Sequence, residues 1–591
     1  MKITNAVFDA CLKCKYKAWN ILNGEQGVPH AYEEIRAELQ EEHKVLATTI
    51  LLKRLKLSSA SSFTRLSEPI LSERHPLILD TVVEEGQLRV HCDALKLVDD
   101  KSALGNILYE PVLFHAFRKI QKDDKLCLAL AGYVLSKVQG MHPPKGKIIF
   151  GENCSVTTVQ LMNLNKTMLD VVHILLRMIR SESKPTLFLN QHCNICAFRD
   201  KCQEEAIETD TLSRLRGITE KEFERQNNRG IFTVEQYSYT YRPRKRRTNV
   251  QNQIRKHHLA LNALAIRTDT IYIEQVPELP LAKNHIYLDI EGLPDRDFYY
   301  LLSAIVHQGG KQDSYTFWAD NKSCEQDLWL SFTSLINSMD DFVIFHYGNY
   351  DIRGLIQMCR RYDGGQAFEE LLLATAYNVL SAIYGHIYFP CYANDLKSVA
   401  SCLGFRWHDP DSSGIKSIIE RLSWERSACK KSRDWLIRYN KDDCEALRCV
   451  TNAIHALSQN RQTDDFHLSK TVVHTDAMKE PHAHELIDHH AFFPELEIIN
   501  RRSYFDYQRN RVYVRTNHDY KRRVRQVLAR KQSRRPVDKK ITLETPTHCP
   551  YCKAMSFYCH SLLETVVEDL KFNSKGVKRW NIKYTTGSNI Y

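Results

Sequence analysis

Residues 285–292 read HIYLDIEG, and this stretch decides the expected fold of the middle of the chain. On a β-strand the apolar side chains at positions 286, 288 and 290 share one face, and Asp289 and Glu291 point together from the other. Two carboxylates this close repel each other unless a cation lies between them. The stretch therefore predicts a strand with a divalent-cation site. The alternative is an antiparallel strand whose polar face leaves both carboxylates solvated.

A second segment predicts a third carboxylate near this strand. Residues 341–345 (DFVIF) form a short apolar run that is typical of a buried strand. The following residues 346–352 (HYGNYDI) offer Gly348 for a turn and Asn349 as the N-cap of a helix that continues to Arg361. This assignment places Asp351 in the first turn of that helix.

A third segment, residues 434–450 (DWLIRYNKDDCEALRCV), predicts a helix with a carboxylate on its buried face. Helical spacing places inward Leu436, Tyr439, Asp443, Leu447 and Val450. Tyr439 and Asp443 are then one turn apart, and a buried carboxylate needs a metal or a partner. The alternative is a helix register that differs by one residue. Asp442 lies off the stripe and is not assigned to the site.

The order of these motifs, D-x-E, then Asp, then Y-x-x-x-D, resembles the DEDDy group of ribonuclease-H-like 3′–5′ exonucleases, in the form called the YprB-type domain. Four sequence stretches within about residues 283–457 are also similar to that domain: YLDIEGLPDRDFYYLLS, FHYGNYD, NDLKSVASCLGFRW and YNKDDCEAL. The resemblance implies a mixed sheet with flanking helices. It further implies that two Mg²⁺ or Mn²⁺ ions are held by Asp289, Glu291, Asp351 and Asp443, with Tyr439 orienting the attacking water.

Length and composition indicate a folded chain of several domains. The chain has 591 residues, which is too long for a single hydrophobic core. Its residues are 43% hydrophobic and 10% aromatic, as in folded globular proteins. The sequence contains no run of 18 apolar residues and no apolar signal region at its N-terminus. We therefore expect a cytoplasmic protein without a membrane partner.

One segment carries almost all of the net charge. Residues 501–540 contain 15 Lys and Arg against three Asp, a net of +12, while the whole chain carries +11. Tyrosines interleave with the basic residues, a pattern that suits phosphate contact and base stacking on DNA or RNA. The candidate nucleic-acid contacts are Arg511, Arg515, Lys521, Arg522, Arg523 and Arg525. The alternative is a solvated helix or a linker.

The 18 cysteines of a chain without an export signal indicate metal ligands or reduced thiols rather than disulfides. Cys193, Cys196 and Cys202 form a C-x2-C-x5-C group, which needs a fourth ligand. With Cys14 far upstream, the set resembles the iron–sulfur RecB-type nucleases, a class that includes CRISPR-associated exonucleases. The resemblance implies a [4Fe-4S] cluster, with Zn²⁺ as the alternative metal and Cys11 as the alternative fourth ligand.

That family carries a PD-(D/E)xK nuclease core between these ligands, and the present sequence departs from it. LRVHCDALKLV offers Asp93 at a strand end and ILYEPVLFH offers Glu110, but Val112 occupies the position of the lysine. Lys119 could supply the ammonium instead. We expect a DNA-binding or structural remnant, and a second, active nuclease site remains the alternative.

The C-terminal residues contain half of a zinc-binding pattern. Cys549 and Cys552 form C-x2-C, followed by Cys559 and His560. VEDLKFNSKGVKRWNIKY, residues 567–584, resembles the stretch between the two knuckles of a zinc ribbon. We expect a partial ribbon at the end of a truncated chain; the alternative is that Cys559 and His560 complete the zinc site.

Taken together, the chain resembles bacterial RecB-like putative nucleases with a C-terminal YprB-type domain. The expected fold is α/β multidomain. A PD-(D/E)xK-like domain (1–208) precedes a helical connector similar to helix-hairpin-helix elements (209–282) and the ribonuclease-H-like domain (283–457). A basic linker (458–540) and the partial zinc ribbon (541–591) follow. The expected function is a metal-dependent nuclease, a 3′–5′ exonuclease on DNA or RNA. The alternative is a non-catalytic nucleic-acid-binding scaffold of a mobile element.

Overall fold

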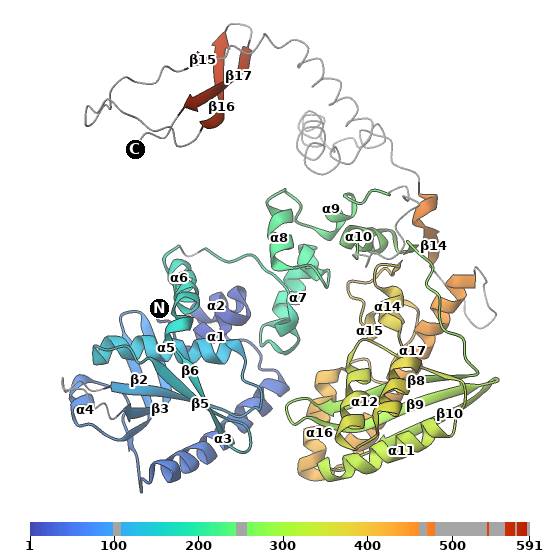
Figure 1. Cartoon of the computed structure of the whole chain (residues 1–591), viewed down its shortest axis with the longest axis horizontal. Coiled ribbons are helices and arrows are strands. Elements are labelled where there is room, and N and C mark those ends of the chain that lie inside the picture. Colours follow the sequence, from blue (N-terminus) through green and yellow to red (C-terminus); the bar gives the residue numbers. More distant parts are fainter. Residues whose placement is uncertain are drawn as a thin grey trace. The chain divides into compact units, whose positions relative to one another are not determined.

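The computed structural model describes residues 1–98, 108–181, 183–243, 257–459 and 470–478, together with the backbone of strands at 541–542, 562–573 and 576–587. The chain divides into two compact units, Met1–Glu480 and Pro481–Tyr591. The first unit holds two large β-sheets with separate cores (Figure 1), and a third, small sheet. Within the described residues, no helix is both long and apolar enough to cross a bilayer.

The N-terminal sheet has six strands in sequence order. β2, β3 and β4 are antiparallel, β4 and β5 are parallel, and β6 is antiparallel to β5. The strands are β1 (Ser61–Ser62), β2 (Leu77–Glu85), β3 (Leu88–Val98), β4 (Leu108–His115), β5 (Lys145–Phe150) and β6 (Ser155–Gln160).

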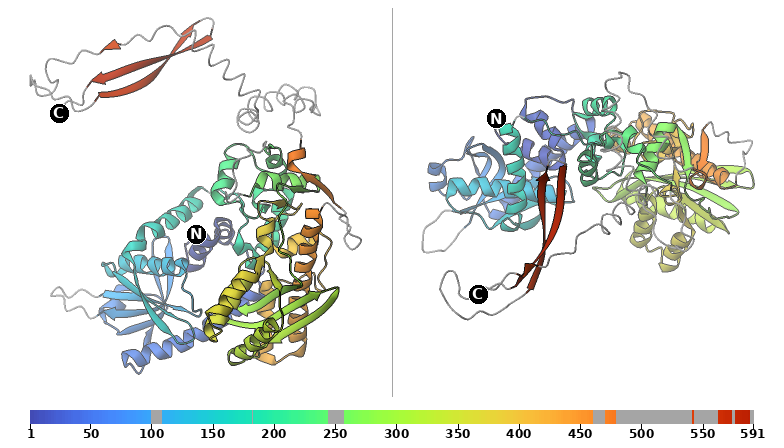
Figure 2. Two further views of the ribbon diagram at one scale, coloured as in Figure 1. Left: turned by 45° about the vertical axis from the view of Figure 1, so that its right-hand side comes forward. Right: turned by 90° about the horizontal axis from the view of Figure 1, so that it is seen from above.

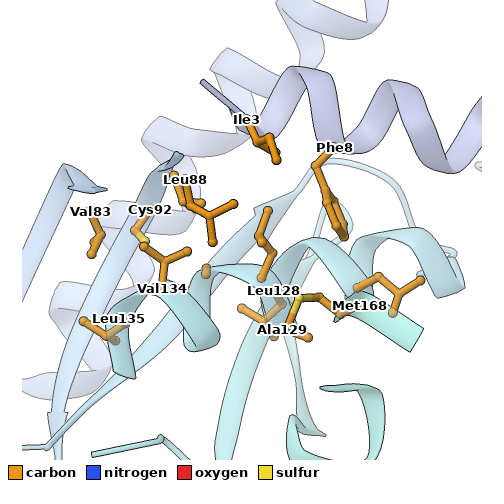
Figure 3. Close-up of a cluster of buried hydrophobic side chains, with 14 of the residues drawn as sticks. Ile3, Phe8, Val83, Leu88, Cys92, Leu128, Ala129, Val134, Leu135 and Met168 are labelled. Atoms are coloured by element: carbon orange, nitrogen blue, oxygen red, sulfur yellow. The ribbon is translucent and has the colours of Figure 1, made fainter. Parts of the chain in front are cut away.

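Helices cover both faces of this sheet. On one face, side chains of α1 (Asn5–Lys13), α5 (Lys122–Gln139) and α6 (Asn165–Ser181) form the main core with β2 and β3. Figure 3 shows Phe8, Leu128 and Val134 in this cluster. On the other face, α3 (Ala31–Leu55) packs against Ala94, Val112 and Phe114. The remaining helices of this region are α2 (Lys15–Leu22), α4 (Glu68–Ser72) and α7 (Arg199–Glu208).

Short helices connect the two sheets along the chain. They are α8 (Glu220–Asn227), α9 (Val234–Ser238) and α10 (Leu259–Thr268). Gly217 and Gly230 have φ values of +95° and +79°, so glycine suits the turns on either side of α8. A small sheet in the order β13-β7-β14 follows, with β7 at Thr270–Ile273, β13 at Ile387–Tyr388 and β14 at Thr471–His474.

The second large sheet has the order β10-β9-β8-β11-β12. β8, β9 and β10 are antiparallel neighbours, whereas β8, β11 and β12 run parallel. The strands are β8 (Asn284–Leu293), β9 (Phe298–Gln308), β10 (Lys311–Trp318), β11 (Phe342–His346) and β12 (Ala376–Asn378). This mixed sheet confirms the predicted α/β class.

Helices pack on both faces of this sheet as well (Figure 1). Ile286, Leu288 and Ile290 of β8 face α11 (Glu325–Asn337) and α12 (Tyr350–Arg361). Tyr287 faces the other core, which α17 (Lys430–Gln459) lines. The predicted alternation of β8 is therefore confirmed. The other helices are α13 (Gln366–Thr375), α14 (Val379–Ile383), α15 (Leu396–Cys402) and α16 (Gly414–Ser427).

The second unit is described only through the backbone of its strands. β16 (Leu562–Asn573) and β17 (Gly576–Gly587) form a long antiparallel hairpin, and β15 (Ile541–Thr542) pairs with β17 (Figure 2). The candidate basic contacts between residues 511 and 525, and Cys549, Cys552, Cys559 and His560, lie outside the described residues.

Candidate active site

Two parallel strands deliver carboxylates to the same end of the second sheet. β11 pairs with β8 in a register that places Phe345 opposite Tyr287. Beyond this pair β8 continues into Asp289 and Glu291, while β11 ends and turns at Gly348, which has φ +82°. α12 then begins at Tyr350, so Asp351 lies in its first turn as predicted. The Asn349 side chain does not cap the helix; it accepts a hydrogen bond from Asn378.

α17 brings a third carboxylate to this point. Asp289, Glu291 and Asp443 each place a carboxylate oxygen within 4.8 Å of the other two. We call these three residues the carboxylate cluster. Leu436, Leu447 and Val450 of α17 are buried as predicted, whereas Tyr439 and Asp443 of the same stripe are half-buried. Asp442, predicted to lie off the stripe, is buried and binds His408.

Asp351 lies beside the cluster without joining its close group of oxygens. Its Oδ1 accepts a hydrogen bond from the backbone N–H of Ile290, 3.3 Å away. The side chain is buried, and burial raises its pKa to about 7 although three backbone N–H groups oppose the shift. The charge of Asp443 also raises this pKa. All four predicted carboxylates are therefore near one another.

Burial and mutual repulsion make the cluster electrostatically costly. Burial is the largest cause of a raised pKa at each member, and the charges of neighbouring carboxylates add to it at Asp289 and Glu291. The pKa of Glu291 rises to about 8 and that of Asp443 to about 6. A divalent cation between the oxygens would remove this repulsion.

Tyr439 is fixed against the cluster from the same helix. Its hydroxyl hydrogen-bonds to Asp443, one turn along α17. Its ring stacks on Trp435 with centroids 5.4 Å apart and planes 14° from parallel. Trp435 Nε1 donates to Asp409 Oδ2 over 2.8 Å. Burial and the nearby carboxylates raise the pKa of Tyr439, so the hydroxyl keeps its proton at neutral pH.

Three side chains that the sequence motifs did not predict also contact the carboxylate cluster. Trp407 Nε1 donates to Asp443, Ser417 Oγ donates to Glu291, and Asn440 Nδ2 donates to Asp289. Trp407 lies in the stretch NDLKSVASCLGFRW, but nothing in its local pattern points to a carboxylate. The partners of Ser417 and Asn440 are more than 100 residues away, so no local signal could have found them.

The β-bulge after Glu291 requires a glycine. The pairing of β8 with β9 shifts register between Glu291 and Gly292. A Cβ on Gly292 would come within 2.8 Å of the Phe298 carbonyl oxygen and of the Tyr350 hydroxyl. The bulge turns the end of the strand, as β-bulges beside active sites do.

The donor set fits a hard divalent cation. The atoms that could bind a metal here are the carboxylate oxygens of the cluster, and Mg²⁺ and Mn²⁺ prefer such oxygen ligands. Asn440, which contacts Asp289, has a buried Oδ1 that finds no hydrogen-bond partner within the described residues. Such an acceptor can take a hydrogen bond from a water held in a filled site.

The N-terminal sheet places the residues of the predicted PD-(D/E)xK site apart. Asp93 lies inside β3 rather than at a strand end, because the strand continues to Val98. Phe114 N donates to Asp93, whereas Glu110 pairs with Lys96, three residues further along β3. Lys119 is exposed and follows β4.

Basic side chains surround Asp93 instead. Burial raises the pKa of Asp93; the Phe114 N–H and the charges of His91 and Lys44 oppose the rise, and the charge of Asp80 adds to it. His91 Nδ1 lies 3.9 Å from Asp93 Oδ1, while His91 Nε2 and Lys44 bond to Asp80. His43 of α3 also interacts with Asp93. His43 and Lys44 both lie on α3, about 50 residues before Asp93 in the chain, so no local sequence pattern around Asp93 could predict them.

The predicted cysteine ligands meet in one small cluster. Cys196 and Cys202 are buried together, and Cys14 packs against them. The charges of Cys196, Cys193 and Cys14 reinforce burial in raising the pKa of Cys202 to about 12. Cys11, by contrast, belongs to the main core of the sheet. Among the residues described, no three of these sulfurs lie within 4.8 Å of one another.

Comparison with protein families matches residues 286–455 to the RNase_H superfamily. No curated protein matches the chain. The matched range contains β11, α12 and nearly all of β8 and α17, and with them the whole carboxylate cluster. Residues 286–455 therefore form a ribonuclease-H-like domain of the kind found in metal-dependent nucleases.

Proposed function

We propose that the protein is a 3′–5′ exonuclease that hydrolyses phosphodiester bonds of DNA or RNA in its ribonuclease-H-like domain. The convergence of three carboxylate oxygens within 4.8 Å, inside the matched domain, carries this proposal. The direction of cleavage rests on the resemblance of the motif order to the DEDDy exonucleases.

The cluster would hold the first divalent ion through Asp289, Glu291 and Asp443. Asp351, beside Ile290, would complete a site for two Mg²⁺ or Mn²⁺ ions. Two such ions supply the positive charge that activates water and stabilises the leaving oxygen. The protein's part is to keep the buried Asp351 and the three half-buried carboxylates of the cluster close together, and ionised when the ions are present.

Tyr439 would orient the attacking water. Because the Tyr439 hydroxyl donates its hydrogen bond to Asp443, its oxygen remains free to accept a hydrogen bond from a water O–H. The stack on Trp435 fixes the ring, so the acceptor stays in place. The raised pKa excludes Tyr439 as a base at neutral pH, which makes it a positioning hydroxyl rather than a proton acceptor.

The test is cleavage of end-labelled single-stranded DNA and RNA by the full chain with Mg²⁺ or Mn²⁺. A 5′-labelled strand should shorten one nucleotide at a time, and a blocked 3′ end should stop the reaction. Asp289→Asn should abolish cleavage. Asp313→Asn, which changes an exposed carboxylate of β10 paired with Lys311, is the matched control. A wild-type protein that binds but never cuts would favour the non-catalytic scaffold.

We also propose that the four clustered thiols of Cys14, Cys193, Cys196 and Cys202 hold a [4Fe-4S] cluster. The C-x2-C-x5-C spacing with an upstream cysteine supports this proposal, because it resembles that of the iron–sulfur RecB-type nucleases. Zn²⁺, which also binds four thiolates, is the alternative metal. The iron–sulfur cluster would connect α7 to the turn between α1 and α2, and would stabilise an N-terminal domain that binds the substrate. The basic segment 501–540 would add salt-dependent affinity.

Iron and sulfide analysis with visible absorbance tests this second proposal. Cys14→Ser should remove the absorbance and lower the melting temperature of the purified protein. Cys11→Ser, the same change three residues earlier in the main core, should keep the absorbance. A colourless protein that contains stoichiometric zinc would replace the iron–sulfur assignment.

A further inference from the structure

Each carboxylate of the cluster accepts a hydrogen bond from an uncharged side chain. Trp407, Ser417 and Asn440 supply these donors from three places: the segment between α15 and α16, the first turn of α16, and α17. The pairs are Trp407 Nε1 with Asp443 Oδ1 at 2.7 Å, Ser417 Oγ with Glu291 Oε2 at 2.7 Å, and Asn440 Nδ2 with Asp289 Oδ2.

We infer that Trp407, Ser417 and Asn440 are positioning residues that hold the three carboxylates converged and thereby set the affinity for divalent ions. The inference rests on the proposed function of the same site. Carboxylates this close would otherwise rotate apart to reduce their repulsion. A hydrogen bond to one oxygen fixes the plane of the carboxylate and leaves lone pairs for an ion.

The uncharged character of the donors matters for this role. A lysine or arginine in their place would form an ion pair and compete with the metal for the carboxylate. Lys397 is close enough to lower the pKa of Asp443, but its ammonium donates to the carbonyl oxygens of Pro410 and Ser412 at 2.8 and 2.5 Å. Indole, hydroxyl and amide donors stabilise the carboxylates while the full negative charge remains for the cation.

Trp407 is held rigidly on α17. Its indole is buried and packs edge-on against Phe405, with ring centroids 4.8 Å apart. The next residue, His408, binds Asp442 twice: through its backbone N–H at 3.0 Å and through Nδ1 at 2.7 Å. Two successive residues of the segment thus bind two successive residues of the helix. This double contact fixes the register in which Trp407 meets Asp443.

Ser417 is fixed by the anchoring of α16. One turn further along, Arg421 is fully buried and donates to the carbonyl oxygens of Ala319 and Asp320. Its guanidinium lies 4.5 Å from the Trp424 ring centre. These contacts tie α16 to the residues that follow β10 and hold Ser417 opposite Glu291. Its hydroxyl also lies 2.9 Å from the Gly414 carbonyl oxygen, the other acceptor open to its single proton.

The test measures binding of Mn²⁺ to the full chain from the electron paramagnetic resonance signal of the free ion. Trp407→Phe and Ser417→Ala should each weaken binding by about 10- to 100-fold. Ser417→Thr keeps the hydroxyl and should restore binding. Ser417→Ala removes only one oxygen, so it tests the inference even if Trp407→Phe does not fold. The Mn²⁺ concentration that gives half-maximal cleavage should rise in parallel, and the rate at saturating Mn²⁺ should recover.

Matched controls make the same substitutions away from the cluster. Trp19→Phe changes an indole that packs against the core of the N-terminal sheet, and Ser427→Ala removes a hydroxyl from the same helix α16. Both should bind Mn²⁺ like the wild type. If wild type binds Mn²⁺ tightly and Trp407→Phe and Ser417→Ala bind equally well, the inference is wrong and the proposed function stands. A wild type that binds no Mn²⁺ would refute both.

Discussion

The two large sheets differ in the charges that surround their enclosed carboxylates. In the ribonuclease-H-like domain, Asp289 and Glu291 sit among other carboxylates, and like charge adds to the effect of burial on their pKa values. In the N-terminal domain, burial and the charge of Asp80 raise the pKa of Asp93, while the Phe114 N–H and the charges of His91 and Lys44 oppose the rise. The first arrangement calls for a cation from outside, whereas in the second Lys44 and His91 already bond to the neighbouring Asp80.

This difference locates the expected chemistry. Repulsion among buried carboxylates costs stability, and folded proteins keep such groups mainly where a function uses them. The surroundings of Asp93 form a balanced network, and its sheet does not bring Glu110 beside it. This contrast supports the proposal that cleavage takes place at the second sheet and that the first has a structural or binding role.

The sharpest test of this contrast compares Asp443→Asn with Asp93→Asn, the same substitution in the two sheets. Removing a metal-binding carboxylate should lower the cleavage rate by roughly 100-fold or more, since loss of a mere supporting group costs about 10- to 100-fold. Asp93→Asn should leave the rate within about twofold of wild type. Cleavage that survives Asp443→Asn and disappears in Asp93→Asn would reverse the assignment and revive an active N-terminal site.

Two glycines extend the comparison to packing. Gly292→Ala places a Cβ 2.8 Å from the Phe298 carbonyl oxygen, and Gly146→Ala in β5 places one 2.9 Å from Leu128 Cδ2. Overpacking of this kind costs about 1–3 kcal/mol in either sheet. Only Gly292→Ala should also slow cleavage, by about tenfold, because it displaces the neighbouring Glu291. Urea unfolding and initial rates measure the two effects, and equal rates for both variants would contradict the contrast.

The smallest effect is on thermal stability, and its sign follows from the raised pKa values. The folded protein binds more protons than the unfolded chain between about pH 4 and the pKa of Glu291, about 8. Stability of the metal-free protein should therefore fall as pH rises through this window. Added Mg²⁺ should raise the melting temperature by about 2–4 °C at pH 8 and by less at pH 5.5.

Asp289→Asn is the control for this pH dependence, since it removes one of the repelling charges. Its melting temperature without metal should fall less between pH 5.5 and pH 8 than that of the wild type, and Mg²⁺ should change it little. An Mg²⁺ effect that is equal at both pH values, or that persists in Asp289→Asn, would place the ion elsewhere.

The sequence by itself determined the elements that carry the candidate site. Period-two alternation predicts β8, the short apolar run predicts β11, and helical spacing places Asp443 on the buried stripe of α17. These signals are local, because side-chain direction depends only on the backbone within a few residues. The spacing of Cys193, Cys196 and Cys202 is likewise local, and these three thiols are close enough in the structure for their charges to interact.

Tertiary structure alone decided how those elements meet. Ser417 and Glu291 are 126 residues apart in the chain, and Asn440 and Asp289 are 151 apart, so no periodicity links them. The register of β3 and β4 separates Glu110 from Asp93, and α3 brings His43 to Asp93 instead. A local pattern fixes where a side chain points, but hydrogen-bond partners and the charge around a buried carboxylate depend on the packing of distant segments.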